Sequence, residues 1–315
     1  MLSRTADHLY WMSRYIERAE NTARLLDIAY QTTLQPQSAE ESEQSWRSLV
    51  SISELHGQYG SHYSTIDGRN VMEFMVADED NPSSIFNCLR AARENARAVR
   101  GSLTTEVWET MNQTWLEFRR LLREGLLARD PSALFEWVKY RSHLSRGVTV
   151  GTMLQDEAFH FIRIGSFLER ADNTARLLDV KFYRHDGESS PERDTARDFY
   201  YWSAVLRSVS GFEIYRKVYS NVIQPDKVAE LLILRPDMPR SMSHCVTRMY
   251  ANLKRVANPQ SAETLRRVGR LEAELAFGRI DEIMEEGLHP FLDGFLAEVA
   301  GLGAQISRDF LVPST

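Results

Sequence analysis

The chain has 315 residues, 43% of them hydrophobic and 26% charged, which is typical of a soluble globular protein with one large or two medium domains. Its net charge of −6 argues against generic nucleic-acid binding, which needs a concentrated positive surface. Apolar runs fall short of the roughly 18 residues that span a bilayer. Neither the charged N-terminal segment nor the two cysteines indicate secretion, so we expect a cytoplasmic protein without a membrane segment.

Helical periodicity dominates the first half of the chain. Residues 5–34 contain neither proline nor glycine, and Pro36 predicts the end of this first helix. Pro82 is expected to open a later helix, with Ser83 and Ser84 in its first turn. The further helices predicted in this half cover residues 43–59, 68–77, 81–103, 105–130 and 131–147.

The second half continues the same pattern. A helix is predicted over 154–185 and a polar loop over 186–194. Alternating patterns typical of strands are nearly absent, and the best of them, GVTVGTM at 147–153, is too short to anchor a sheet. The predicted class is therefore all-α. The remaining predicted helices lie around Trp202, Val228, Met242, Leu271 and Leu296.

One segment occurs twice. ERAENTARLLD at 17–27 returns as ERADNTARLLD at 169–179, 152 positions later. Weaker matches continue at offsets of 156 and 157, including Pro82 with Pro239 and Cys88 with Cys245. No flexible linker separates the copies. We therefore predict two related halves, residues 1–150 and 151–315, packed together as one pseudo-two-fold helical bundle.

The repeated segment is retained better than the residues just before it. At about 100° per residue, its polar side chains form one stripe opposite an apolar face of small residues. Solvated positions are expected to drift, and Ser13/Gly165 and Arg14/Ser166 do differ between the copies. The stripe is thus predicted to be buried or half-buried. Its members are Glu17, Glu20, Asn21, Arg24 and Asp27, then Glu169, Asp172, Asn173, Arg176 and Asp179.

Two interpretations of this stripe stay open. In the structural one, the copies face each other across the pseudo-axis, with Glu17 paired to Arg176 and Glu169 paired to Arg24. Removing one member of such a buried pair costs roughly 3–5 kcal/mol, which would explain the retention. In the functional one, the same side chains line a cleft between the halves. Its arginines would bind a carboxylate or phosphate, and its glutamates would bind an amine or transfer a proton.

The duplicated Glu-Arg helix, together with ARENARAVR at 92–100, resembles the bacterial alpha-E family over essentially the whole chain. The resemblance implies an all-helical protein that functions beside a circularly permuted ATP-grasp ligase or a transglutaminase-like peptidase in peptide synthesis or modification. A ligase partner would then act in trans. The resemblance assigns no catalytic residue. The motif positions that transfer are Glu17, Arg18, Asn21, Arg24, Glu169, Arg170, Asn173 and Arg176.

Histidines and cysteines give weaker indications of chemistry. His8 and His160 occupy equivalent positions on the apolar face, where a hydrogen-bonded core histidine is favoured over a catalytic base. Glu157 and His160 have the spacing of di-iron bundles, but Thr5 replaces the glutamate in the first copy. Cys88 and its counterpart are expected to be small core residues. We expect no metal and no cofactor, because no nucleotide-binding motif is present either.

A row of arginines belongs to the first half alone. Its members fall within roughly 80° of one another on their predicted helix. A solvated face is the simpler interpretation, and docking of an acidic partner protein is the alternative. The row consists of Arg90, Arg93, Arg97 and Arg100.

The leading hypothesis is a helical accessory or co-catalytic subunit of a bacterial peptide-modifying system, without independent activity. The alternative is a stand-alone enzyme, a transferase or amidohydrolase, using an inter-repeat Glu/Arg cleft. An open pocket lined by these side chains would favour the enzyme. A closed network of Glu–Arg pairs would favour the accessory subunit.

Overall fold

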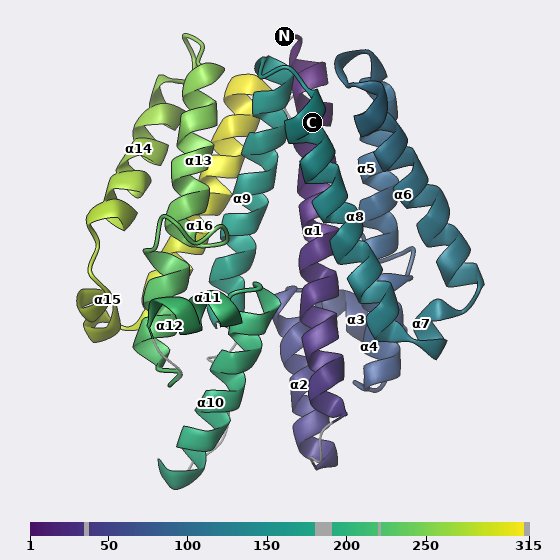
Figure 1. Ribbon diagram of the computed structural model, residues 1–315, viewed down its shortest axis with the longest axis vertical. Coiled ribbons are helices and arrows are strands. Elements are labelled where there is room, and N and C mark those ends of the chain that lie inside the picture. The colour runs from purple at the N-terminus through teal and green to yellow at the C-terminus, as the bar shows by residue number, and fades with distance from the viewer. Residues whose placement is uncertain (35–37, 180–190, 220–221, 312–315) are drawn as a thin grey trace. The chain divides into compact units, whose positions relative to one another are not determined.

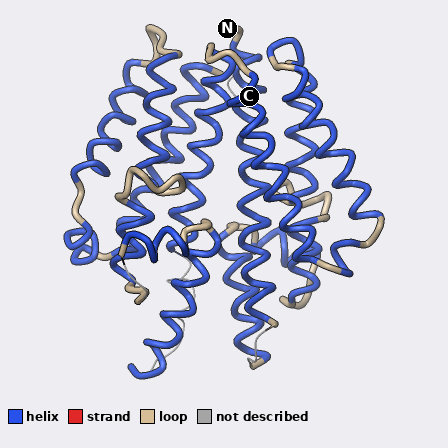
Figure 2. The backbone as a smooth tube through the Cα atoms, in the orientation of Figure 1, coloured by secondary structure: helices blue, strands red, loops and turns tan. Residues whose placement is uncertain are grey.

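The chain is helical throughout its described parts. The computed structural model describes residues 1–34, 38–179, 191–219 and 222–311. Over these ranges it has sixteen α-helices, one turn of 3-10 helix (Arg100–Ser102) and no strand (Figure 2). The predicted all-α class is therefore confirmed. Among these helices, none is both long enough and apolar enough to cross a membrane.

The helices gather into two compact units. Unit 1 comprises Met1–Glu169 with Ser307–Thr315, and unit 2 comprises Arg170–Ile306, so that α9 contributes to both. The division predicted at residues 150/151 concerns the sequence repeat and stays a prediction. The helices that begin in unit 1 are α1 (Ser3–Thr33), α2 (Ala39–Ile52), α3 (His56–His62), α4 (Gly68–Val76), α5 (Ile85–Ala98), α6 (Thr105–Arg123), α7 (Leu126–Arg129), α8 (Pro131–Thr152) and α9 (Glu157–Asp179).

The long helix α1 is the centre of unit 1 and lies beside α5 and α8 (Figure 1). Leu9, Ala23 and Leu26 on its apolar side are fully buried. They recur at the spacing of a helix face, so a continuous stripe of α1 is removed from water. Its opposite, polar side is buried as well, because α8 and the first half of α9 supply charged partners described below. This accounts for a helix that is buried almost all round despite its many polar residues.

Unit 2 has its own core. The five consecutive residues from Val228 to Leu232 of α12 include four that are fully buried. Helix α13 packs against α14, and Cys245 and Met249 of α13 are fully buried. Pro225 starts α12 at its first turn, where a missing backbone N–H costs nothing. The helices that begin in unit 2 are α10 (Pro191–Ser208), α11 (Phe212–Val218), α12 (Pro225–Ile233), α13 (Met242–Arg255), α14 (Ala262–Phe277), α15 (Ile280–Glu286) and α16 (Leu288–Phe310).

Several boundaries differ from the sequence expectation. The segment 43–59 forms two helices, because Glu54 adopts a left-handed conformation with φ 56° between them. The helix predicted over 105–130 is likewise interrupted at Gly125, where φ is 71°. The helix expected to end at Gly147 continues to Thr152, so the candidate strand GVTVGTM is largely helical.

Other expectations fall at the edges of what the structure describes. Pro36 and residues 180–185 of the long predicted helix lie outside the described residues, as does 186–190 of the predicted polar loop. The rest of that loop begins α10. Pro82 stands in the turn before α5, which starts at Ile85, so it precedes the helix rather than opening it.

Matched local contacts recur in the two units. Ser84 and Ser241 each cap the helix that follows, accepting a hydrogen bond from a backbone N–H at 3.2 and 3.0 Å. Tyr59 donates its hydroxyl hydrogen to the carbonyl of Thr65, and Tyr215 donates to that of Val222. These pairs occur at the offsets of the sequence repeat. They agree with a duplication, which itself stays a prediction.

The caps give a first test of this local structure. Ser84→Ala and Ser241→Ala should each lower the free energy of unfolding by about 1 kcal/mol, because each leaves a helix-terminal N–H without its side-chain acceptor. Urea unfolding followed by circular dichroism measures the loss. Ser83→Ala is the matched control and should change stability by less than about 0.5 kcal/mol, since this half-buried serine is not the cap. Equal effects at 83 and 84 would contradict the assignment.

Candidate functional site

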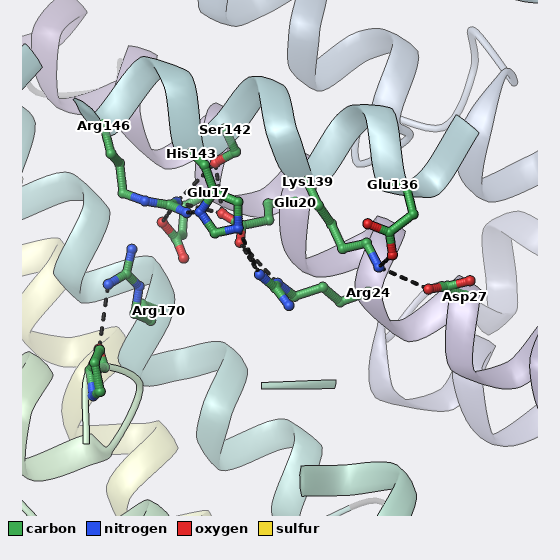
Figure 3. Close-up of polar contacts among 11 residues, drawn as sticks. Glu17, Glu20, Arg24, Asp27, Glu136, Lys139, Ser142, His143, Arg146 and Arg170 are labelled. Carbon is green, nitrogen blue, oxygen red and sulfur yellow. Dashed lines mark hydrogen bonds and ion pairs between the residues drawn. The ribbon is translucent and has the colours of Figure 1, made fainter. Parts of the chain in front are cut away.

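Two buried carboxylates of the repeated segment are neutralised between α1 and α8 (Figure 3). Glu17 and Glu20 are only 1% and 0% exposed. The guanidinium of Arg146 on α8 donates to Glu17 Oε2 at 3.1 Å and also to Glu20. Glu20 also accepts hydrogen bonds from Arg24 Nε at 2.9 Å and from Ser142 Oγ at 2.7 Å. The motif carboxylates therefore have cationic partners inside unit 1.

A histidine lies over this pair of arginines. His143 Nδ1 is 2.7 Å from Arg146 Nη2, and its Nε2 is 3.3 Å from Arg24 Nη2. A neutral imidazole has a single acceptor nitrogen, so at most one of these two contacts is a hydrogen bond. We call the set Glu17, Glu20, Arg24, Ser142, His143 and Arg146 the α1–α8 network.

Asp27 extends the polar contacts toward the end of α1. Lys139 Nζ lies 2.8 Å from Asp27 Oδ2 and also pairs with Glu136, while Ser132 Oγ donates to Asp27 Oδ1 at 3.2 Å. The first-copy stripe thus meets α8 along much of its length (Figure 3). Its predicted burial is confirmed for Glu17, Glu20, Asn21 and Arg24, which are all less than 9% exposed, and Asp27 is half-buried.

The glutamate of the second motif copy is bound by α1. Arg18 donates two hydrogen bonds to the buried carboxylate of Glu169, from Nε to Oε1 at 2.6 Å and from Nη2 to Oε2 at 3.1 Å. Arg14 donates to the same carboxylate at 2.7 Å, and its guanidinium lies over the rings of Trp11 and Tyr10. We call Arg14, Arg18 and Glu169 the Glu169 cluster. It joins the Glu-Arg dipeptides of the two copies directly.

The register of α1 and the first half of α9 explains this choice of partners. A side chain at Gly165 would collide with the Tyr10 carbonyl and the Ser13 hydroxyl, so glycine permits a close approach there. Glu169 follows one turn later and reaches Arg14 and Arg18. Arg24 lies about 9 Å farther along α1 than Arg18, at 1.5 Å per residue. The predicted Glu169–Arg24 pair is therefore wrong, whereas a Glu17–Arg176 pair would join the two units and stays a prediction.

Charge and burial act together on the Glu169 cluster. Burial alone would raise the pKa of Glu169, but Arg14 and Arg18 overcome this and hold its pKa at about 2. The carboxylate in turn raises the pKa of Arg18, which burial would lower. Burial raises the pKa of the nearby Cys88 thiol to about 12. Cys88 is fully buried and unreactive in this state, as expected of a core cysteine.

The other second-copy positions lie in unit 2. Arg170 is 8% exposed and donates to the Pro239 carbonyl at 3.4 Å. Arg176 pairs with Asp172 one turn earlier at 2.8 Å, and Asn173 is half-buried. Asp179 is 1% exposed and accepts from His289 Nδ1 at 2.6 Å. This hydrogen bond raises the pKa of His289.

The secondary candidates have structural surroundings. His8 contacts Asn95 Oδ1 at 2.8 Å and is half-buried, which fits the favoured interpretation of a hydrogen-bonded histidine. His160 is half-buried beside the ring of Phe159. Among the residues that the structure describes, possible metal ligands lie within 4.8 Å of one another at two places that the sequence patterns did not indicate. These are His62, Asp78 and Asp80, and Asp179, His289 and Asp293.

The arginine row is partly compensated within the chain. Arg90 lies 3.5 Å from Glu79, and Arg97 lies 2.7 Å from Glu94. Arg93 donates to Asn112 Oδ1 at 2.8 Å, and Arg100 lies over the ring of Trp108. Arg90 and Arg97 are nevertheless 47% and 65% exposed, so they offer charge to solvent. Docking of a partner on this row stays a prediction.

A narrow pocket borders the α1–α8 network. Its lining includes Glu17 and Arg146 together with Ser13, Ser145 and Ser166. Its interior has room for about one water molecule. Of its three charged lining residues, Glu17 and Arg146 form an ion pair with each other, and Arg163 is the third. The enclosed space beside Glu17 is therefore about the size of one water molecule.

Sequence reasoning missed the partners rather than the motif. Arg14 was interpreted as a drifting, solvated position, but it is 18% exposed and binds Glu169. Arg146 and His143 belong to α8, outside the repeated segment, so no pattern within that segment could indicate them. The spacing of Arg141 and Arg146 in RSHLSR is ordinary for a surface helix and gives no sign of a buried partner. Their role follows from the packing of α8 on α1.

Comparisons with known proteins agree with the helical architecture. The family model Alpha-E, described as a predicted alpha-helical domain with a conserved ER motif, matches residues 1–311. The chain is also similar to uncharacterised proteins of Mycobacterium bovis (strain ATCC BAA-935 / AF2122/97) and Mycobacterium tuberculosis (strain CDC 1551 / Oshkosh), each 27% identical over 321 residues. These matches cover 96% of this chain but 35% of each relative, so it spans about a third of their length. No solved structure matches the chain.

The Glu169 cluster predicts a pH-dependent contribution to stability. Because the folded-state pKa of about 2 is below the ordinary 4.5, the contribution is fully present above pH 4.5 and is lost as pH falls toward 2. Its size is about 3 kcal/mol. The stability difference between wild type and Glu169→Gln, measured by urea unfolding from pH 2 to 7, should shrink across this window. A stability difference that stays constant with pH would contradict the cluster. The control Glu43→Gln changes an exposed glutamate and should alter stability very little at any pH.

The α1–α8 network predicts a large effect of removing one cation. Arg146→Met keeps an apolar stem but leaves Glu17 and Glu20 without this guanidinium. The free energy of unfolding at pH 7 should therefore fall by about 3 kcal/mol in urea unfolding. Arg120→Met is the matched control, because Arg120 is 52% exposed in an i,i+4 pair with Glu124. Arg120→Met should lower the free energy of unfolding by less than about 0.5 kcal/mol. Similar losses in both variants would show that the network adds nothing.

Proposed function

Because the chain belongs to the Alpha-E family, we propose that it is a helical accessory subunit of a bacterial peptide synthesis or modification system, acting in trans with an ATP-grasp ligase. The observation that carries this proposal is the internal neutralisation of the motif. Glu17, Glu20 and Glu169 are buried, and each accepts hydrogen bonds from arginine within unit 1. The motif then builds a rigid helical body rather than a reaction centre.

The electrostatics favour this role over general acid–base catalysis. A general base works best when its pKa lies near the operating pH, and its carboxylate must reach the substrate proton. The pKa of Glu169 at about 2 makes it a weak base, and both its oxygens are engaged by Arg14 and Arg18. Glu17 borders a pocket with room for about one water. These features give less support to a stand-alone transferase or amidohydrolase.

The relatives support an association with further protein. The region similar to this chain makes up 35% of each mycobacterial relative, so it is joined there to other polypeptide. A helical domain that is covalently joined to further polypeptide in some proteins is suited to binding a separate protein in others. We propose the exposed arginines of the row, Arg90 and Arg97, as part of the docking surface for an acidic face of the ligase.

Binding to the partner gives the direct test. The chain should co-purify with a circularly permuted ATP-grasp ligase from the same genome, and the double variant Arg90→Glu/Arg97→Glu should weaken this binding at least tenfold in a titration at 0.1 M salt. The matched control is Arg266→Glu/Arg270→Glu, which reverses two arginines of α14 that are 65% and 55% exposed in similar local ion pairs. Equal effects of the two variants would contradict docking at the row.

Partner activity separates an accessory role from a co-catalytic one. ATP hydrolysis by the ligase should change when the wild-type chain is added. Glu17→Gln should leave that change intact if the motif is structural, provided that circular dichroism shows the variant to be folded. Loss of stimulation by a folded Glu17→Gln variant, with binding unchanged, would instead assign Glu17 a catalytic part.

A further inference from the structure

One face of α8, the helix in front of α1 in Figure 1, carries two large exposed side chains, Tyr140 and Leu144. Tyr140 and Leu144 are 69% and 44% exposed, and Gly147 and Gly151 continue the same line toward the end of the helix. The intervals of four, three and four residues keep all four within about 60° of one another. This is the spacing of a helix–helix seam. We call these four residues the α8 seam.

No close contact among the described residues requires the two glycines of the seam. A side chain at either position would meet no atom within 4 Å, so neither is required by close packing. Both lie inside a helix, where glycine is less favourable than almost any other residue. Gly165 on α9 provides the contrast, because a side chain there would collide with α1. Gly147 and Gly151 thus leave two hollows on an exposed apolar face.

The order of large and small residues along the seam identifies its occupant. We propose that the α8 seam binds the α8 seam of a second copy of this chain in the antiparallel direction, about a two-fold axis between Ser145 and Arg146. In that register residue 140 faces 151 and residue 144 faces 147. Each bulky side chain of one copy then fills a glycine hollow of the other, and a closed two-fold dimer results.

Other alignments fit the seam less well. A parallel pairing would place Tyr140 against Tyr140 and glycine against glycine, which crowds one end and leaves a gap at the other. An unrelated partner helix would not require the seam to be complementary to itself. Arg146 does not oppose the pairing, because its guanidinium points away from the seam toward Glu17 and Glu20. The antiparallel homodimer uses all four seam residues.

The size of the seam limits the strength of this dimer. It spans eleven residues, which is about 16 Å of helix. A single helix pair of this length buries less than the roughly 1,200 Å² of a stable interface. The dimer is therefore weak and reversible, with a dissociation constant in the micromolar range.

Filling the hollows tests the proposal. Sedimentation equilibrium of the wild type should show a monomer at low concentration and a dimer at high concentration, whereas Gly147→Gln/Gly151→Gln should weaken association at least tenfold. Glutamine is a better helix former, so the melting temperature at low concentration should rise by about 1–3 °C per substitution. This rise distinguishes a blocked seam from a damaged fold.

The control uses a glycine in the same surroundings on another helix. Gly294 of α16 is exposed, and a side chain there would also meet nothing within 4 Å. Gly294→Gln should raise the melting temperature but leave association unchanged. A wild type that is monomeric at every concentration, or seam variants that associate like the wild type, would overturn the proposal.

Cross-linking tests the antiparallel register. A mixture of the Tyr140→Cys and Gly151→Cys variants should form a disulfide-linked dimer on mild oxidation, while each variant alone should not. In this register two copies of residue 140 lie about 16 Å apart, and the native Cys88 and Cys245 are buried. Cross-linking of Tyr140→Cys with itself, or none in the mixture, would overturn the antiparallel pairing.

Discussion

The arrangement of unit 1 depends on the burial of the Glu169 carboxylate between two arginines of α1. A buried carboxylate is costly unless its charge and its lone pairs are satisfied, and one cation rarely satisfies both oxygens. Arg18 binds the carboxylate with two bonds, and Arg14 adds a third from one turn earlier. Because both arginines come from one helix, the three groups fix the axial position of the first half of α9, up to Glu169, relative to α1 as well as the distance between them.

The adjacency of glutamate and arginine in the motif has a geometric consequence. Neighbouring residues on a helix point about 100° apart, so the side chains of a Glu-Arg dipeptide contact two different neighbouring helices at nearly the same position along the helix axis. On α1, Glu17 meets Arg146 of α8, while Arg18 meets Glu169 of α9. The dipeptide therefore connects three helices. This gives the family's ER motif a structural purpose, and it explains why the polar side of α1 is as thoroughly buried as its apolar side.

The sequence was sufficient for the helical class and for the burial of the first-copy stripe, because both follow from local periodicity. It was insufficient for the pairing. Which arginine reaches Glu169 depends on the register of two helices far apart in the chain, and Arg24 is excluded by about two turns of axial distance. Arg146 could not be found at all from the repeat, since α8 takes part only through packing. Helix ends were missed where Glu54 and Gly125 adopt left-handed conformations.

Positions that differ between the two copies were interpreted as drift, and the structure suggests a different cause. Ser13 and Gly165 differ, yet the hydroxyl of Ser13 occupies the space that a side chain at 165 would need. Arg14 and Ser166 also differ, and there the arginine is the one that binds Glu169. Where α1 and the first half of α9 approach closely, Ser13 and position 165 share one space, so a side chain on one helix excludes a side chain opposite it. When the two sequence segments are compared alone, such positions look unconstrained because their residues differ. The structure shows that packing constrains the two facing residues together.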